Sequence, residues 1–395
     1  MNQMTPNNIP QGYKATALGI IPQEWEVKTL GNIAEINPSK GKITSKVVTF
    51  LAMSDISEQG GVINENILPI DSIKPGLTPF RKGDVIIAKI TPCFENGKGA
   101  LLDKITKDDG FGSTEFHVIR CQQDNKFVYY HTQSYAFRKR LESQMTGSAG
   151  QKRVPADSVA AYKIAVPPLA EQRKIAEVLG VWDEAIEKQA RLIEKLALRK
   201  RALMQRLLSA KLRLPGFSEP WKKVKLGDVA SIKTGNKNNE DKIANGQYPF
   251  FVRSSIVERI NTYSYDGEAI LIPGEGKIGE IIHYINGKFD YHQRVYKISD
   301  FSNCSGLFLY YYLMYFFGKQ AINNSVKACV DSLRLSTFTN MTIIHPPISE
   351  QTAIAEVLTA ADREIELAKE KLERLRRQKR GLMQQLLTGK KRTKI

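Results

Sequence analysis

The residues that first suggest chemistry form a glycine-rich stretch, GEGKIG, at residues 274–279. Its spacing satisfies G-x-G-x-x-G and it follows a strand-like run, an arrangement that binds a dinucleotide phosphate when a helix comes next. The residues that follow, EIIHYING, read as another strand and offer no helix N-terminus. The stretch is therefore predicted to be a glycine-rich hairpin and not a phosphate-binding loop.

Three other patterns are typical of catalysis, and none is complete. Glu275 and Lys277 match the E-x-K end of a metal-dependent nuclease site, but a tripeptide is too short to define one. Asn37 and Pro38 open the N-P-P-aromatic motif of adenine methyltransferases, which here lacks its second proline and its aromatic residue. The five histidines show no zinc-hydrolase spacing. We therefore expect no catalytic residue and no metal site in this chain.

A different group of side chains suits contact with nucleic acid. Arg, Asn, Gln and Ser can make paired hydrogen bonds to base edges in a major groove, whereas Lys mostly meets phosphate. Such residues gather in turns of two separate stretches of the chain: Lys89, Thr91, Asn96, Lys98, Gln151, Lys152 and Arg153 in the first, and Arg253, Ser254, Ser255, Lys277, Gln293, Arg294, Lys327 and Arg334 in the second. For each of them alone, solvated surface is the favoured interpretation, so the prediction of a DNA-binding site depends on the set.

The overall charge favours the same partner. The chain has 58 Lys and Arg against 41 Asp and Glu, a net charge of +17, which indicates a polyanion or a basic membrane-facing surface. The most apolar run, residues 307–317, is too short to cross about 30 Å of hydrocarbon, so it predicts a buried helix. The N-terminal residues lack a signal-peptide pattern and the four cysteines form no C-x-x-C pair, from which we expect a cytoplasmic protein with reduced thiols.

The elements that must position these turns are short strands. Runs such as DVIIAKI, EFHVIRC, AILIP and RVYKIS are separated by Gly, Asn and Pro turns and followed by an aromatic helix in each stretch, which predicts two α+β domains. The domains resemble each other at their ends. Trp25 and Leu30 match Trp221 and Leu226 at an offset of 196, and residues 127–130 match 308–311 at an offset of 181.

The same offset of 181 pairs Arg153 with Arg334, which we interpret as equivalent residues in matching loops just before the last strand of each domain. We predict a DNA contact or a loop-fixing role for both. Shared ends around dissimilar interiors indicate one fold used twice with different recognition surfaces, although drift after duplication would leave a similar pattern.

A long helical segment follows each domain and is itself repeated. Residues 167–211 recur as residues 346–390 at a constant offset of 179, with 22 of the 45 positions identical. Apolar residues recur alternately four and three positions apart in both copies, the seam of a helix that packs against another helix. Each helix would be about 60 Å long at 1.5 Å per residue, with Gly180 as a site for a kink.

A lysine interrupts each seam at the same position, Lys200 in the first copy and Lys379 in the second. The favoured interpretation is a residue that fixes helix register or extends its ammonium group into solvent. A specific contact with a partner is the alternative.

The combined motifs resemble the specificity subunits of type I restriction-modification systems. The resemblance rests on P-P-[LI]-x-E-Q-x-x-I-A-E-V-L at Pro167 and Pro346, R-x-L-M-Q-x-L-L at Arg201 and Arg380, and W-x4-L-G at Trp25 and Trp221, and it covers nearly the whole chain. It implies an α+β fold in which two pseudo-repeated target recognition domains are separated by two long antiparallel α-helices that form a coiled-coil spacer. The expected boundaries are 1–166 for the first target domain, 167–213 for the central helical spacer, 214–345 for the second target domain, and 346–395 for the C-terminal helical spacer and basic tail.

The resemblance also implies a function and partners. Each target domain would read one half of a split, asymmetric site on double-stranded DNA, while the helices would set the spacer and dock the methyltransferases. Two methyltransferase subunits using S-adenosylmethionine and two restriction (motor) subunits using ATP and magnesium are implied, so this chain itself would hold no cofactor. Two alternatives remain: an enzyme, either a free-standing nuclease or a fused modification enzyme, and a helical scaffold without base specificity.

Overall fold

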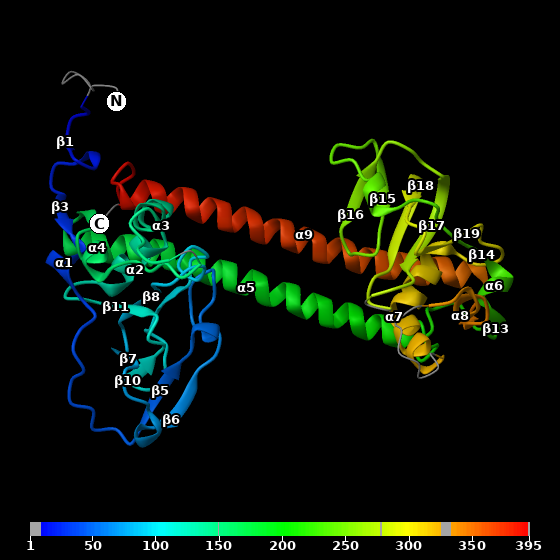
Figure 1. The fold of residues 1–395 in the computed structure, drawn as a ribbon, viewed down its shortest axis with the longest axis horizontal. Helices are drawn as coiled ribbons and strands as arrows, with labels where there is room; N and C mark the ends of the chain where they lie inside the picture. Colours follow the sequence, from blue (N-terminus) through cyan, green and yellow to red (C-terminus); the bar gives the residue numbers. More distant parts are fainter. Residues whose placement is uncertain (1–8, 149, 277–278, 325–332, 394–395) are drawn as a thin grey trace. The chain divides into compact units, whose positions relative to one another are not determined.

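The computed structural model describes residues 9–148, 150–276, 279–324 and 333–393. The chain divides into two compact units, the first made of residues 1–188 and 372–395 and the second of residues 189–371. Each unit holds one α+β domain and one end of each of two long helices, α5 (Leu169–Leu207) and α9 (Ile348–Leu387) (Figure 1). The predicted fold class, two α+β domains with two long helices, is confirmed.

The first unit builds its domain from short strands in four small sheets, ordered β1-β2, β6-β5-β10-β7, β4-β11-β8-β9 and β12-β3. Pairing is antiparallel except between β5 and β10. The strands are β1 (Tyr13–Thr16), β2 (Gly19–Pro22), β3 (Glu26–Thr29), β4 (Ala34–Ile36), β5 (Val47–Leu51), β6 (Asn66–Pro69), β7 (Thr78–Arg81), β8 (Val85–Ala88), β9 (Gly99–Leu101), β10 (Asp109–Gly112), β11 (Phe116–Cys121) and β12 (Lys163–Val166).

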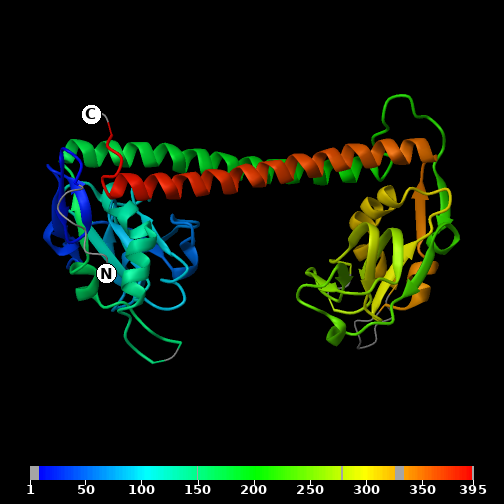
Figure 2. The ribbon, with the colours of Figure 1, turned by 90° about the horizontal axis from the view of Figure 1, so that it is seen from above.

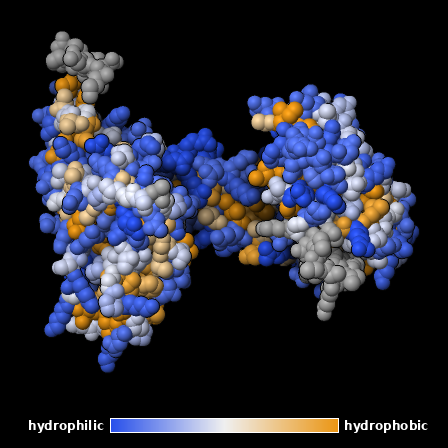
Figure 3. Space-filling model, in the orientation of Figure 1, coloured by the Kyte–Doolittle hydropathy of each residue, from blue (hydrophilic) through white to orange (hydrophobic). Residues whose placement is uncertain are grey.

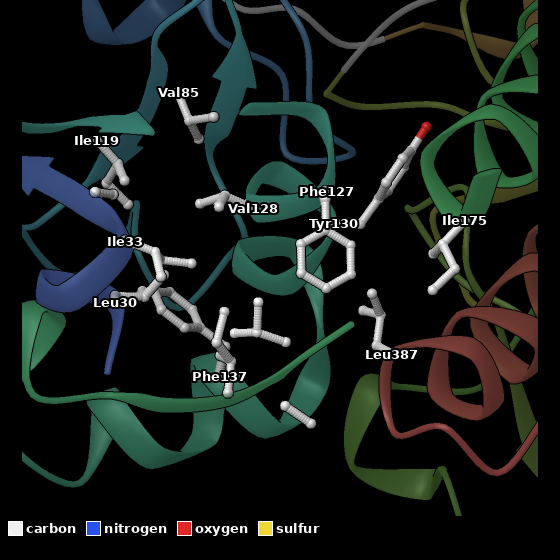
Figure 4. Close-up of a cluster of buried hydrophobic side chains, with 14 of the residues drawn as sticks. Leu30, Ile33, Val85, Ile119, Phe127, Val128, Tyr130, Phe137, Ile175 and Leu387 are labelled. Atoms are coloured by element: carbon white, nitrogen blue, oxygen red, sulfur yellow. The ribbon is translucent and has the colours of Figure 1, made fainter. Parts of the chain in front are cut away.

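Short helices cover these sheets: α1 (Leu30–Ile33), α2 (Asn125–Gln133), α3 (Tyr135–Glu142) and α4 (Ala156–Ala160), with 3-10 turns η2 (Met53–Asp55) and η3 (Ile70–Ser72). Helix α2 begins where the Asp124 side chain accepts a hydrogen bond from the Phe127 amide, a standard N-cap. It buries Phe127 and Tyr130 in a core shared with Ile175 of α5 and Leu387 of α9 (Figure 4). The core thereby joins the domain to both long helices of its unit.

The second unit has one larger sheet of six strands, ordered β14-β19-β17-β18-β15-β16, and a separate pair, β13-β20. The strands are β13 (Lys222–Lys225), β14 (Ser231–Thr234), β15 (Tyr248–Phe251), β16 (Val257–Ile260), β17 (Tyr265–Pro273), β18 (His283–Tyr291), β19 (Val295–Ser299) and β20 (Thr342–His345). The helices are α6 (Leu226–Val229), α7 (Gly306–Asn324) and α8 (Leu335–Thr339), with the 3-10 turn η4 (Asn239–Asp241).

Helix α7 contains the apolar run noted in the sequence. Its Phe308, Leu309, Leu313 and Phe317 side chains are at most 1% exposed, which confirms the predicted buried helix. Over the part of the chain that the structure describes, no helix combines the length and apolarity needed to cross a membrane.

Both domains close in the same way. Strand β3 pairs with β12 in the first unit, and β13 pairs with β20 in the second, so the strand that directly follows Trp25 or Trp221 lies beside the last strand of its domain. The amide of Leu30 bonds to the Tyr162 carbonyl at 2.9 Å, and the amide of Leu226 bonds to the Met341 carbonyl at 2.8 Å. The repeated ends seen in the sequence therefore build one frame twice.

Within each unit the two long helices run antiparallel (Figure 2). In the first unit, Glu171 near the start of α5 binds Arg392 beyond the end of α9, and Asp183 binds Lys379. In the second unit, Glu350 binds Arg213 and Asp362 binds Lys200. These two ion pairs recur in both units with the helices exchanged, because Glu171, Asp183, Lys200 and Arg213 correspond to Glu350, Asp362, Lys379 and Arg392 at the offset of 179.

The two seam lysines do not extend into solvent. The side chain of Lys200 is 13% exposed and that of Lys379 is 14% exposed, and each ammonium binds a carboxylate of the opposite helix at 2.5 Å. The expectation of a solvated ammonium group was wrong, and a role in helix register fits the cross-helix pairing. Helix α5 continues through Gly180, where an added Cβ would meet the flexible end of the Lys126 side chain, 2.7 Å from Nζ.

Candidate nucleic-acid interface

Five of the seven predicted residues of the first domain come together. The segment after β8 meets the segment that precedes α4: the Thr91 amide donates to the Lys152 carbonyl at 3.0 Å, and the Thr91 hydroxyl donates to the Gly150 carbonyl at 3.1 Å. The Val154 amide donates to the Lys89 carbonyl at 2.9 Å. Backbone bonds thus hold Lys89, Thr91, Gln151, Lys152 and Arg153 on one small surface, on which Gln151 and Lys152 are exposed.

Arg153 is fixed by a carboxylate of the same surface. Its guanidinium donates to both oxygens of Glu115, at 2.8 Å from Nη2 and 3.0 Å from Nε, and its Nη1 donates to the Gln151 carbonyl. The bond from Arg153 lowers the pKa of Glu115 against the opposing effect of burial. This geometry supports the loop-fixing role predicted for Arg153.

The other two predicted residues point to a different loop. Asn96 donates to Oε1 of Glu58 at 3.0 Å, and Nζ of Lys98 donates to the Met53 carbonyl at 2.9 Å. Lys98 is half-buried. Its ammonium group binds a carbonyl of the loop that follows β5 and is poorly placed to contact a DNA phosphate.

In the second domain four connections converge on two adjoining hollows of about 420 and 390 Å³, which we call the arginine hollow. The connections are the η4 segment, the turn after β15, the turn after β17 and the turn between β18 and β19. Four predicted residues line it: Arg253, Ser254, Gln293 and Arg294. Three residues, Asn239, Arg253 and Glu275, border both hollows.

Glu275 holds the two arginines of the hollow. Nη1 of Arg253 donates to Oε2 of Glu275 at 3.0 Å, and Nε of Arg294 lies 3.4 Å from Oε1. The arginine side chains stay 43% and 61% exposed. One carboxylate therefore orients two guanidinium groups whose remaining N–H groups are free to face a ligand.

A buried histidine lines the second of the two hollows. His292 is 4% exposed, and its Nδ1 accepts a hydrogen bond from the Arg294 amide at 2.9 Å. Burial lowers the pKa of His292, and the charge of Arg253 lowers it further. Near neutral pH this imidazole is therefore uncharged and acts as an acceptor that shapes the turn.

Gln293, which lines the hollow, also links two of its connections. Gln293 donates to Asn238 at 2.6 Å, which ties the turn between β18 and β19 to the η4 segment. Ser255 is exposed beside the hollow without lining it. Lys277 and Lys327 lie outside the described residues.

Arg334 is not the counterpart of Arg153. Arg334 is the N-cap residue of α8, and the N-cap residue of the matching helix α4 is Pro155. The bond from the Val154 amide to the Lys89 carbonyl is matched by one from the Leu333 amide to the Gly274 carbonyl, at 2.6 Å. Equivalence here follows the offset of 179, so the interpretation of Arg153 and Arg334 as equivalent residues was wrong. The offset of 181 holds only up to α7.

The true counterpart of Arg294 is Glu115. The Gly274 amide donates to the Arg294 carbonyl at 2.8 Å, as the Lys89 amide donates to the Glu115 carbonyl at 2.9 Å. Arg294 immediately precedes strand β19, and Glu115 immediately precedes strand β11. One backbone position thus carries a guanidinium in one domain and a carboxylate in the other, each paired with an opposite charge.

Sequence reasoning missed the acidic and amide partners. Glu115 and Asn239 gave no signal, because neither belongs to a motif, whereas Glu275 was noticed only as part of the incomplete E-x-K pattern. That pattern lies between the antiparallel neighbours β17 and β18, which confirms the predicted hairpin. In the described ranges no group of His, Cys, Asp and Glu side chains could hold a metal ion.

Comparison with known proteins identifies the family. The family described as "Type I restriction modification DNA specificity domain" matches residues 22–197 and again residues 218–377. The EcoAI specificity subunit of Escherichia coli is 42% identical over 160 residues, which is 39% of this chain and 27% of that protein. The putative MjaX specificity subunit of Methanocaldococcus jannaschii is 25% identical over 97% of both chains. The chain thus spans about a quarter of the EcoAI subunit but nearly all of the MjaX subunit.

The fold is shared with a solved structure as well. A chain from a study of complex assembly and conformational transition in the type I R-M system matches with a TM-score of 0.63 and 20% identity, over 93% of this chain and 99% of that one. Two matches to one domain family, covering most of the sequence, agree with the two α+β domains. The chain belongs to the family of type I restriction modification DNA specificity domains and carries that domain twice.

Proposed function

We propose that this chain is the non-catalytic DNA-specificity subunit of a type I restriction-modification enzyme. Each target domain reads one half of a bipartite, asymmetric site on double-stranded DNA. The observation that carries the proposal is the shared frame with different side chains at equivalent turns, Glu115 in one domain and Arg294 in the other. Two target domains that share a backbone frame but carry opposite charges at the position of Glu115 and Arg294 suit the recognition of two different DNA sequences.

The basic charge supplies the sequence-independent part of binding. A net charge of +17 favours contact with phosphates, and each phosphate contact releases counterions, so affinity falls steeply with salt. The side chains at the turns then distinguish bases. Binding is therefore expected to combine a strong salt dependence with a defined sequence preference.

The long helices set the spacing and dock the methyltransferases. Two methyltransferase subunits would use S-adenosylmethionine, and two restriction subunits would use ATP and magnesium, so the cofactors belong to the partners. The complex would act in the cytoplasm, where those partners meet DNA. In this proposal the chain supplies DNA affinity and sequence specificity, and the partner subunits supply the catalytic activities.

Selection from random duplexes, with the methyltransferase partner present, tests the proposal. The expected result is two short fixed motifs separated by a spacer of constant length. Equal recovery of all sequences would favour a helical scaffold without base specificity, and methylation or cleavage by the purified chain alone would favour an enzyme. Either result would overturn the proposal.

A further inference from the structure

The described residues that line the arginine hollow balance in charge, and this balance restricts the ligand. The described lining contains three cations and three carboxylates: Lys242, Arg253 and Arg294 with Glu240, Glu258 and Glu275. Lys242 is paired with Glu258 at 3.1 Å, and Glu275 is shared by the two arginines. A phosphate placed here would meet carboxylates as well as arginines, whereas a neutral ligand would meet no such repulsion.

The free donors define the chemistry of that neutral ligand. Arg253 uses Nη1 and Arg294 uses Nε to bind Glu275, which leaves the Nη2 group of Arg253 and both terminal nitrogens of Arg294 available. A guanidinium held in a fixed plane is suited to a pair of neighbouring acceptors. In the major groove only guanine offers two adjacent acceptors, O6 and N7, without a donor between them.

Amide side chains beside the arginines extend the same surface. Asn239 borders both hollows, and Gln293 and Asn238 are held together by a hydrogen bond. The visible face of this unit around β15 and β17 is mostly hydrophilic, as a surface that meets base edges should be (Figure 3). The hollow thus presents polar groups that can donate and accept without adding net charge.

We infer that the second target domain reads guanine through Arg253 and Arg294, with Glu275 as the residue that positions both. This inference rests on the proposed function and names the base for one half-site. The first domain lacks this arrangement, since Met53 follows β5 where Arg253 follows β15, and Glu115 replaces Arg294. The guanine preference should therefore be confined to one half of the DNA site.

The test is the same duplex selection, carried out with the full chain and its methyltransferase partner. The wild type should select guanine at one or two positions of one half-site. Arg294→Ala and Arg253→Ala should each lower the preference for guanine there by about 10- to 100-fold and leave the other half-site unchanged. Arg294→Lys keeps the charge but not the planar fork, so it should lose the preference while retaining binding to unrelated DNA.

Glu275 has its own readout. Glu275→Gln keeps the shape of the side chain but weakens its interaction with both arginines, so other bases should be selected more often at the positions where the wild type selects guanine. Glu275→Asp should restore part of the guanine preference. A purely structural role would instead lower thermal stability without changing the selected word. Urea unfolding of each variant separates these outcomes.

Phosphate binding predicts a different pattern. Arg294→Ala would then weaken all duplexes about equally and reduce the slope of log K against log salt by about one, and Arg294→Lys would restore both. That pattern, or an unchanged guanine preference in both alanine variants, would overturn the inference. Failure of the wild type to select any word would instead count against the proposed function, so the two failures are distinguishable.

Discussion

Lys379 of α9 donates to Asp183 of α5 at 2.5 Å, and the same carboxylate accepts the hydroxyl of Tyr130 from the target domain at 2.7 Å. The ammonium also lies 5.1 Å from the centre of the Tyr130 ring. The second unit repeats the arrangement with Lys200, Asp362 and Tyr311. Each carboxylate thus joins three elements: both long helices and the target domain.

Removal of the Lys379 ammonium group should lower the stability of the first unit. Lys379→Met leaves Asp183 with only the Tyr130 hydroxyl, and the carboxylate is partly exposed, so we expect a loss of about 1–2 kcal/mol in the free energy of unfolding. Urea unfolding, followed by the fluorescence of the three tryptophans, of which Trp25 and Trp182 lie in the first unit, measures it. Lys174→Met, at an exposed i,i+3 pair with Glu177, is the control and should cost less than about 0.5 kcal/mol. Equal losses would contradict the role given to Lys379.

The two domain-start tryptophans differ in their polar contacts. Nε1 of Trp25 donates to the buried carboxylate of Glu171 at 2.9 Å, whereas Nε1 of Trp221 is buried without a partner among the described residues. Both changes to phenylalanine remove similar volume, but only Trp25→Phe removes a hydrogen bond to a charged group. We expect Trp25→Phe to lower stability by about 1–2 kcal/mol more than Trp221→Phe, as measured by urea unfolding. The opposite ranking would contradict the assigned contacts.

Arg392 should matter to the first unit although it lies beyond the end of α9. Its guanidinium donates to both oxygens of Glu171, at 2.7 and 2.9 Å, and Glu171 is fully buried. Arg392→Ala should cost about 1–3 kcal/mol, because it leaves a buried charge with Trp25 alone. Adding Glu171→Gln to that variant should recover part of the loss. Arg213→Ala tests the equivalent contact of the second unit, and both losses appear in thermal unfolding.

The sequence predicted the helices well because their information is local and repeated. The residues spaced alternately four and three positions apart, from Ile175 to Leu207 and from Ile354 to Leu386, are all at least half-buried. They include the polar Gln189, whose amide donates to the Ala368 carbonyl of the other copy at 3.0 Å. The partner of Lys379 was not predictable in the same way. Asp183 lies on the opposite helix, and only the antiparallel register brings the two residues together.

The candidate site was predicted in part for a similar reason. Residue type identified Arg253 and Arg294, but the fold brings Glu275 between them from a third connection that sequence spacing does not link to either. The error at Arg334 arose from alignment by residue identity. The second domain has two residues fewer somewhere between residues 311 and 333, so the two arginines match in type, while the backbone bonds of Val154 and Leu333 place them two positions apart.

Mild acid should destabilise the first unit through His131. The ring is 6% exposed, its Nε2 has no hydrogen-bond partner among the described residues, and burial lowers its pKa to about 3. The unfolded chain, with an ordinary histidine pKa near 6.5, therefore binds a proton that the folded protein does not, and stability falls as the pH drops below about 6.5. Between pH 7.5 and pH 5.0 this group alone should cost about 2 kcal/mol.

His131→Phe isolates that contribution. The substitution keeps an aromatic ring beside Phe127, whose centre lies 4.8 Å from that of His131, and removes the unpaired Nε2. Because phenyl is larger than imidazole and the site is buried, the test is how the stability difference changes with pH and not its value at pH 7.5. His117 and His292 also have lowered pKa values and contribute acid sensitivity of the same sign, so the variant keeps part of the wild-type slope. The difference in unfolding free energy between variant and wild type should therefore grow by about 2 kcal/mol in favour of the variant from pH 7.5 to pH 5.0. Parallel curves over that range would mean that His131 is protonated in the folded protein or exposed to water.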